Sequence, residues 1–279
     1  MIDISTLTIP AIAAPMTGVS TPELVIAACN AGIIGAFPSS NCESVAELGD
    51  WLDRIEKARR PLAGPVAVNL IVRNRRIDAD LACVIAHSVP IVITSVGDPT
   101  PTLAPLQSAG VEVYVDVASL RHARRAVDAG ADGLVLLSAG AGGHTGWANP
   151  FAFARAVRTF FDGPLVLAGG VSDGVALWAA VTLGYDLGYL GTKLIATLES
   201  GAGASWRDAV VRSTLDDVEL TVAPNGLAAN LLRPNGNPSG SAGHTVSGVN
   251  HLMSVAEVVS LTEGEWVSAR ARTLERLVT

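Results

Sequence analysis

Residues 66–72 read Val-Ala-Val-Asn-Leu-Ile-Val, an almost unbroken apolar run. A strand with one solvated face alternates apolar and polar residues, whereas a strand of a parallel sheet is covered on both faces and reads as continuously apolar. Residues 66–72 therefore predict a buried strand in a parallel sheet. The more polar stretch before it, residues 43–58, has helical spacing, as expected if helices cover such a sheet.

The same two patterns, a short apolar run and a more polar stretch with helical spacing, alternate from residue 9 to about residue 195. Helices are also predicted over residues 21–31 and from Ser119 to Ala129, each after a capping residue. The predicted strands are residues 9–15, 33–37, 65–71, 91–96, 112–117, 133–138, 165–169 and 187–191. Eight strand–helix units predict an α/β fold, a closed (β/α)8 TIM barrel. An open doubly wound sheet is the alternative, because the number of strands does not prove closure.

The rest of the chain predicts an addition to this barrel. We expect the barrel to occupy residues 1–200 and a loop-rich C-terminal extension, residues 201–279, to pack on it. Residues 223–250 are rich in Pro, Gly, Asn and Ser, which predicts a long loop or a mobile lid. The spacing of apolar residues predicts a final helix over about residues 254–278, although Gly264 could break it.

Composition excludes several classes of protein. The chain is 49% hydrophobic and 16% charged, which is incompatible with dominant disorder. Its net charge of −7 argues against nucleic acid or an anionic membrane surface as a partner. No window approaches the roughly 18 unbroken apolar residues of a membrane span, and the N-terminus lacks the features of a signal peptide. We therefore expect a cytoplasmic protein; a homo-oligomer is compatible with the sequence.

The cysteines and short motifs indicate no metal site. Cys29, Cys42 and Cys83 lie far apart with no C-x-x-C pair, which is typical of reduced, packed thiols rather than a disulfide framework or a zinc site. No H-E-x-x-H metal motif, P-loop, G-x-G-x-x-G fingerprint or G-x-S-x-G nucleophile elbow is present.

Glycines follow the last two predicted strands. In a (β/α)8 barrel the functional face is formed by the loops after the carboxyl ends of the strands, and phosphate is usually bound after the last two. Gly169, Gly170 and Gly191 leave backbone N–H groups unobstructed there, so a phosphate could be held without Lys or Arg. The alternative is that these glycines only make tight turns.

The loop after the sixth predicted strand carries one histidine among glycines. Residues 140–146 read Gly-Ala-Gly-Gly-His-Thr-Gly. Glycine lets a cofactor ring approach the backbone closely, and histidine exchanges a proton near neutral pH. We predict that His144 is catalytic, although a lone histidine is often structural. The other four histidines lie in predicted helices or in the tail and carry no such prediction.

Together these loops resemble the nitronate monooxygenase family, formerly called the 2-nitropropane dioxygenases. The resemblance covers roughly residues 9–195, and its most specific element is the Ala-Gly-Gly-His-x-Gly run of the histidine loop. The matching pieces are Ala14-Pro15-Met16-Thr17-Gly18-Val19-Ser20-Thr21-Pro22-Glu23-Leu24, the strand with Asn69, Ala141-Gly142-Gly143-His144-Thr145-Gly146, Ala168-Gly169-Gly170-Val171 and Gly191-Thr192.

The resemblance implies FMN as cofactor and a small-molecule substrate with O2. It implies that His144 lies beside the flavin and either deprotonates a nitroalkane or holds an anionic nitronate, which is oxidised to a carbonyl compound and nitrite. The candidate cofactor-binding residues are Ala14, Pro15, Met16, Asn69, Asp116, Ala141, Gly142, Gly143, Gly169, Gly170, Gly191 and Thr192.

Two departures from the family pattern bear on the substrate. Many members have Gln-Gly-x-Glu where this chain has residues 137–140, Leu-Ser-Ala-Gly, and many have a basic residue where this chain has Asp116. Loss of a cation should disfavour an anionic reduced flavin or an anionic substrate. We therefore predict a divergent subgroup whose substrate need not be a simple nitronate.

Two other functions stay open at this point. FMN-dependent enoyl reductases and NAD(P)H:quinone reductases share the barrel and the histidine loop, and reduced nicotinamide should bleach the flavin of such enzymes. A flavin-binding protein without catalysis is the third option, which the presence of His144 disfavours.

Overall fold

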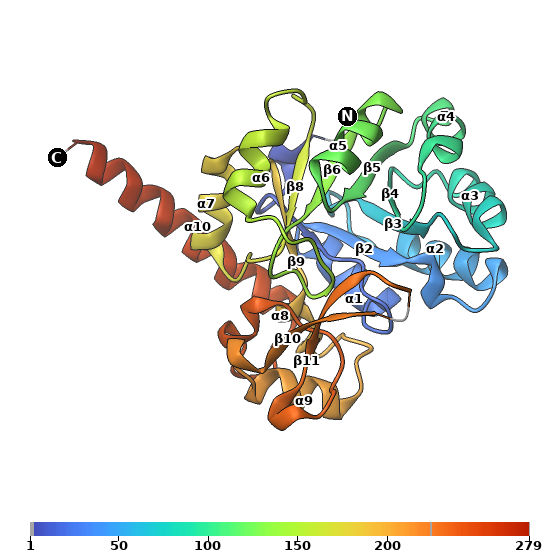
Figure 1. Ribbon diagram of the computed structural model, residues 1–279. Coiled ribbons are helices and arrows are strands. Elements are labelled where there is room, and N and C mark those ends of the chain that lie inside the picture. Colours follow the sequence, from blue (N-terminus) through green and yellow to red (C-terminus); the bar gives the residue numbers. More distant parts are fainter. Residues whose placement is uncertain (1–2, 224, 279) are drawn as a thin grey trace.

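The eight predicted strands form a closed parallel barrel (Figure 1). The computed structural model describes residues 3–223 and 225–278. Each predicted strand is confirmed to within two residues at either end. The barrel strands are β1 (Ala11–Ala13), β2 (Ile34–Pro38), β3 (Val66–Ile71), β4 (Ile91–Ser95), β5 (Glu112–Val117), β6 (Gly133–Leu137), β8 (Leu165–Ala168) and β9 (Leu187–Leu190). Because β1 pairs with both β2 and β9, the alternative of an open sheet is wrong.

Helices alternate with these strands around the barrel. The predicted helices over 21–31, 43–58 and 119–129 are confirmed, and each begins after a side-chain cap from Thr21, Ser44 or Ser119. The helices are α1 (Pro22–Asn30), α2 (Val45–Ala58), α3 (Ile77–Ala86), α4 (Thr100–Ser108), α5 (Leu120–Asp128), α6 (Pro150–Val157), α7 (Gly174–Leu183), α8 (Thr192–Ile195), α9 (Ala204–Arg212) and α10 (Val255–Val278). None of the helices in the described chain combines the length and the apolar character that a membrane crossing requires.

Side chains that point into the barrel change character along its axis. Successive residues of a strand point to opposite faces, so every second residue lies inside. The deeper inward positions are filled by an apolar cluster that includes Ile12, Ile93 and Val135. At the carboxyl ends of β3, β4, β5 and β9 the inward positions are polar instead: Asn69, Ser95, Asp116 and Tyr189. The barrel therefore has an apolar interior and a polar mouth.

The expectation of a loop over residues 223–250 is wrong in part. The strand β10 (Val218–Val222) pairs antiparallel with β11 (Ala228–Leu232), which in turn pairs with β7 (Gly143–His144). The five residues of β11 include no β-branched side chain, so its conformation follows from tertiary pairing rather than from local preference. The C-terminal segment thereby adds two strands beside the histidine loop.

The final helix, α10, runs without a break through Gly264. Glycine in a helix interior costs about 1 kcal/mol relative to alanine. Packing against α7 offsets this cost, because Trp266 makes an edge-to-face contact with Trp178 at 5.4 Å and Glu265 accepts a hydrogen bond from the amide of Gly174 at 3.0 Å. Figure 1 shows α10 passing α7 and extending beyond the barrel.

Candidate active site

A cavity of about 640 Å³ lies at the carboxyl end of the barrel. It is lined by all the residues predicted for the site, although their binding roles stay predictions. These residues are Ala14, Pro15, Met16, Asn69, Asp116, Ala141, Gly142, Gly143, His144, Gly169, Gly170, Gly191 and Thr192. The sequence reasoning missed further lining residues, which include Ser95, Leu137, Tyr189, Trp206, Ser241, Ala242 and Gly243. We call this space the cofactor cavity.

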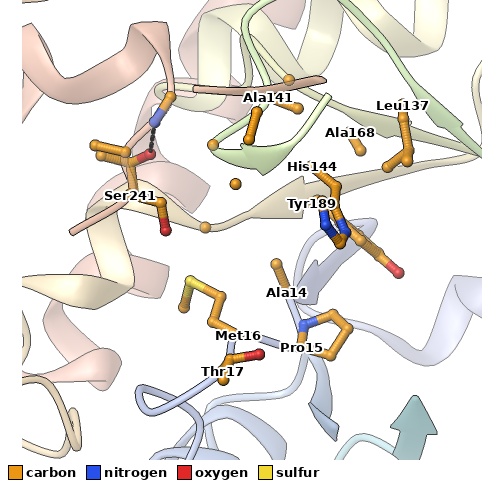
Figure 2. A pocket seen from close by; sticks show the side chains of 18 of the residues that line it. Ala14, Pro15, Met16, Thr17, Leu137, Ala141, His144, Ala168, Tyr189 and Ser241 are labelled. Atoms are coloured by element: carbon orange, nitrogen blue, oxygen red, sulfur yellow. Dashed lines mark hydrogen bonds between the residues drawn. The ribbon is translucent and has the colours of Figure 1, made fainter. Parts of the chain in front are cut away.

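The loop after β1 forms one side of the cofactor cavity and is held by its own hydrogen bonds. The hydroxyl of Ser20 donates to the carbonyl of Ala14 at 3.1 Å and accepts from the amide of Met16 at 3.0 Å. The side-chain amide of Asn41 donates to the carbonyls of Met16 and Ser20. Figure 2 shows this loop lying across the cavity from Ala141.

Backbone groups dominate the side of the cofactor cavity formed after β8 and β9. Gly170 has a φ of +82°, a conformation that disfavours other residues, and open space where a Cβ would stand. Within residues 3–223 and 225–278 the amides of Gly142, Gly170 and Gly191 make no hydrogen bond, and no Lys or Arg side chain lines the cavity. Free amides beside glycines can bind an anionic phosphate, so the donor set fits the phosphate of a flavin.

Polar side chains at the mouth of the barrel supply further groups. Asn69 and Ser95 hydrogen-bond to each other, and the Asn69 amide also donates to the carbonyl of Ile93 at 3.1 Å. In contrast, Oδ1 of Asp116 and the hydroxyl of Tyr189 are buried and have no partner among the described residues. Buried polar atoms are normally hydrogen-bonded, so these two are suited to face the polar edge of a bound ligand.

Burial changes the acid–base chemistry of this pair. Loss of solvation raises the pKa of Asp116 to about 7, so this carboxyl can hold a proton near neutral pH. Burial, and secondarily the nearby Asp116, raise the pKa of Tyr189 well above its usual value, so this hydroxyl remains a donor. The sequence predicted that Asp116, in place of a cation, disfavours an anionic flavin or substrate. This effect is smaller when the carboxyl is protonated and uncharged.

His144 is held by the hairpin of β10 and β11. Its Cα partner in the β7–β11 pairing is Ala229, and its Nε2 lies 2.9 Å from the side-chain amide of Asn225 in the turn of the hairpin. Figure 2 shows the imidazole entering the cavity from above the loop that contains Ala14 and Pro15.

The hydrogen bonds of Asn225 assign the form of the imidazole. Oδ1 of Asn225 accepts from the amide of Leu227 at 3.1 Å, so the Asn225 nitrogen faces the ring and donates. Nε2 of His144 must then be the acceptor, which places the single proton of a neutral ring on Nδ1. A protonated Nε2 would oppose the Asn225 donor. With the hairpin in this position, the hydrogen bonds assign Nε2 of His144 as the acceptor and leave Nδ1 as the donor.

Three more hydrogen bonds join the C-terminal segment to the cofactor cavity. Asn230 donates to the carbonyl of Ala141 at 2.7 Å, and the amide of Gly243 donates to the hydroxyl of Thr192 at 2.8 Å. The amide of His244 donates to the carbonyl of Gly140 at 2.9 Å. A signal for Asn230 was available in the sequence, because it is an amide within the apolar run 228–232.

Comparison with known proteins agrees with this geometry. A family model described as "Nitronate monooxygenase" matches residues 74–248. The chain belongs to the nitronate monooxygenase family. It is therefore a flavin-dependent oxidoreductase on a TIM barrel, as the family resemblance and the strand pattern predicted. Among the residues described, no group of three or more side chains is arranged to bind a metal ion.

Two similar proteins carry names that point to different substrates. A nitronate monooxygenase of Paraburkholderia phytofirmans is 26% identical over 264 residues, which cover 79% of this chain and 72% of that protein. An indene-carboxyl-CoA dehydrogenase of Rhodococcus jostii is 27% identical over 223 residues, covering 80% of this chain and 62% of that protein.

Two solved structures share the fold over nearly the whole chain. FabK from Thermotoga maritima superimposes with a TM-score of 0.87 at 23% identity, covering 98% of this chain and 97% of FabK. Nitroalkane oxidase from Streptomyces ansochromogenes gives a TM-score of 0.85 at 22% identity, covering 97% of this chain and 99% of that protein. At these identities the likeness concerns the fold.

Proposed function

We propose that this protein oxidises anionic nitronates, with FMN as cofactor and O2 as electron acceptor, to a carbonyl compound and nitrite. The observation that carries the proposal is the hydrogen bond from Asn225 to Nε2 of His144, since it makes the ring a donor. A donor can hold an anion such as a nitronate. Because the accepting nitrogen is already occupied, the ring is poorly suited to deprotonate a neutral nitroalkane. Of the two roles that the resemblance implied, binding the anion is the one that this arrangement supports.

The residues that would hold FMN follow from the donor groups of the cofactor cavity. The free amides of Gly170 and Gly191 would bind the phosphate, and Asn69, Asp116 and Tyr189 would meet the polar edge of the ring system. FMN, when bound, supplies the electron-accepting ring and the reaction with O2. The protein positions the substrate: His144 holds the nitronate oxygens, while the hairpin of β10 and β11 covers this side of the cavity.

The test is the visible spectrum of the purified protein under anaerobic conditions, before and after addition of ethylnitronate or nitroethane at the same pH. We expect a flavin spectrum that is bleached by the nitronate and changes far less with the neutral nitroalkane. Nitrite release in air then checks turnover, and chromatography of the released cofactor distinguishes FMN from FAD.

Each alternative gives a different result in this experiment. Bleaching by NADH or NADPH but not by a nitronate would indicate a nicotinamide-linked reductase instead. A flavin that no donor reduces, with the same behaviour in His144→Ala, would indicate a flavin-binding protein without catalysis. Absence of flavin after reconstitution with FMN would refute the proposal.

A further inference from the structure

A second cavity, of about 380 Å³, lies against the cofactor cavity. The two spaces share a wall made of Ser95, Val96, Asp116, Leu137 and His144. The second cavity continues from this wall along the loops after β3 and β4 and along α5, where it is lined by Arg73, Asp98, His122 and Arg125. A ligand that contacts His144 could therefore extend into either space.

The two cavities differ in charge. No cationic Lys or Arg lines the cofactor cavity, whereas two arginines line the second cavity, together with His122 and the shared His144, in a chain whose net charge is −7. Neither guanidinium, that of Arg73 or that of Arg125, makes a hydrogen bond or an ion pair with a residue in the described part of the chain. Both residues are exposed and line the cavity, so their donors are available to a ligand.

The carboxylate on this side does not cancel the two arginines. Oδ1 of Asp98 accepts hydrogen bonds from the amide and the hydroxyl of Thr100 at 3.1 Å and 2.7 Å. This carboxylate oxygen is therefore bonded within its own loop and not to either arginine. Hydrogen bonds from Thr100, and secondarily the charge of Arg125, hold the pKa of Asp98 below its usual range. When Asp116 of the shared wall is protonated, two positive charges thus face one negative charge, with His122 as an additional donor.

The shared wall is a constrained feature rather than a loose loop. Val96 has a φ of +52°, a conformation that is costly for a β-branched residue. Its carbonyl accepts a hydrogen bond from the amide of Arg73 at 3.3 Å, and a Cβ on Gly97 would lie 2.6 Å from the side chain of Val72. These contacts hold the backbone of Arg73 against the wall that contains His144.

We propose that the second cavity binds an anionic group, a carboxylate or a phosphate, at the far end of the substrate, between Arg73 and Arg125. The inference rests on the proposed function in placing the reacting end of that substrate beside His144. It makes the preferred substrate a nitronate with an anionic tail long enough to cross the shared wall, rather than a short alkyl nitronate. Guanidinium groups suit such an anion because they donate paired hydrogen bonds to its oxygens.

Calorimetry on the flavin-loaded protein tests the anion site without any turnover. The probes are hexyl phosphate, hexanoate and hexanol, which share an apolar chain and differ in the terminal group. We expect the two anions to bind more tightly than hexanol, and Arg73→Ala/Arg125→Ala to weaken the better anion about ten-fold, since hydrogen bonds to charged groups have that order of effect. A larger loss for hexyl phosphate assigns a phosphate site, and a larger loss for hexanoate assigns a carboxylate site.

The matched control is Arg75→Ala/Arg121→Ala, which removes the same net charge from arginines that line neither cavity. It should bind all three probes as the wild type does. Equal binding of hexanol and the anions, an unaffected Arg73→Ala/Arg125→Ala variant, or an equal loss in the control would overturn the proposal.

Turnover separates this inference from the proposed function. Nitronates of ω-nitrocarboxylic acids are compared with alkyl nitronates of the same number of heavy atoms, and the advantage of the acids should increase with chain length and vanish in Arg73→Ala/Arg125→Ala. If neither series is oxidised, the proposed function fails, while the calorimetry still decides whether the anion site exists.

Discussion

The two cavities at the carboxyl end of the barrel share a wall but are built from different chemical groups. The cofactor cavity offers glycine backbone, free amides and neutral or protonatable side chains, and the second cavity offers guanidinium groups on flexible stems. Backbone amides are fixed in place and do not titrate, which suits a cofactor that stays bound. Exposed guanidinium groups reorient at little cost, which suits a ligand that enters and leaves. The difference separates the cavity that would hold the cofactor from the cavity that would select the substrate.

The largest expected effect is at the shared wall. His144→Ala should lower the kcat for nitronate oxidation about a hundred-fold or more, the usual range for loss of a positioned proton-exchanging or hydrogen-bonding side chain. Flavin content should stay at the wild-type level, because the amides that would bind the phosphate are untouched. Steady-state nitrite release measures the first quantity and absorbance the second.

His87→Ala is the control for this substitution, since His87 follows α3 and lines neither cavity. Wild-type rates in His144→Ala would show that His144 takes no part in the reaction. The assignment of the reacting end of the substrate to the shared wall would then be wrong.

Asp116→Asn should change stability in a pH-dependent way. Burial raises the folded-state pKa of Asp116 from 3.8 to about 7, so the folded protein binds more protons than the unfolded chain between these values. The contribution of this carboxyl to stability is thus present below pH 4 and is lost as the pH rises through about 7. The asparagine variant lacks this loss and should be more stable than the wild type by about 2 kcal/mol at pH 8.

Urea unfolding of the flavin-free protein at pH 5 and pH 8 measures this difference. Asp98→Asn is the control, because Asp98 is exposed and its pKa is shifted in the opposite direction. An identical pH dependence of stability in wild type and Asp116→Asn would contradict the assignment of a protonated carboxyl at the wall.

Gly170→Ala should act on the cofactor cavity alone. A Cβ at a φ of +82° is strained by about 1–2 kcal/mol, so FMN affinity should fall about five- to thirty-fold as the loop shifts. Binding of hexyl phosphate in the second cavity should not change. Fluorescence titration with FMN measures the loss; Gly203→Ala, where the added Cβ meets nothing within 4 Å and φ is not positive, should bind FMN normally.

The smallest expected effect is at the hairpin turn. Asn225→Ala should raise the KM for nitronates about five-fold, since one hydrogen bond contributes about 0.5–1.5 kcal/mol. Nitrogen NMR of labelled histidine tests the cause: His144 should carry its proton on Nδ1 in the wild type. In Asn225→Asp, where the partner can only accept, the proton should move to Nε2. A wild-type ring protonated on Nε2 would refute the donor role.

Much of this arrangement could be predicted from sequence because it depends on local periodicity and on strand ends. Continuous apolar strands predicted the parallel barrel, and the carboxyl ends of parallel strands converge, so Asn69, Asp116 and His144 were expected at one place. The glycines after β8 and β9 followed from the same geometry.

The missing parts of the site arise from contacts between distant residues. Asn225 lies 81 residues from His144, and β11 has no strand-forming pattern of its own until it pairs with β7. The partnerless state of Tyr189 and the raised pKa of Asp116 depend on what surrounds them in three dimensions, which single-strand patterns do not encode. The second cavity combines residues from the strand–helix units of β3, β4, β5 and β6 with Leu227 of the hairpin turn, and it has no sequence motif.

The pairing of β7 with β11 has a consequence for the order of events during synthesis. The barrel strands are complete once β9 ends at Leu190, but the wall of the cofactor cavity also needs Ala229 and Gly243. All eight barrel strands are therefore synthesised before the residues that complete the cofactor cavity. Cofactor capture would then report that the C-terminal segment has been made and docked.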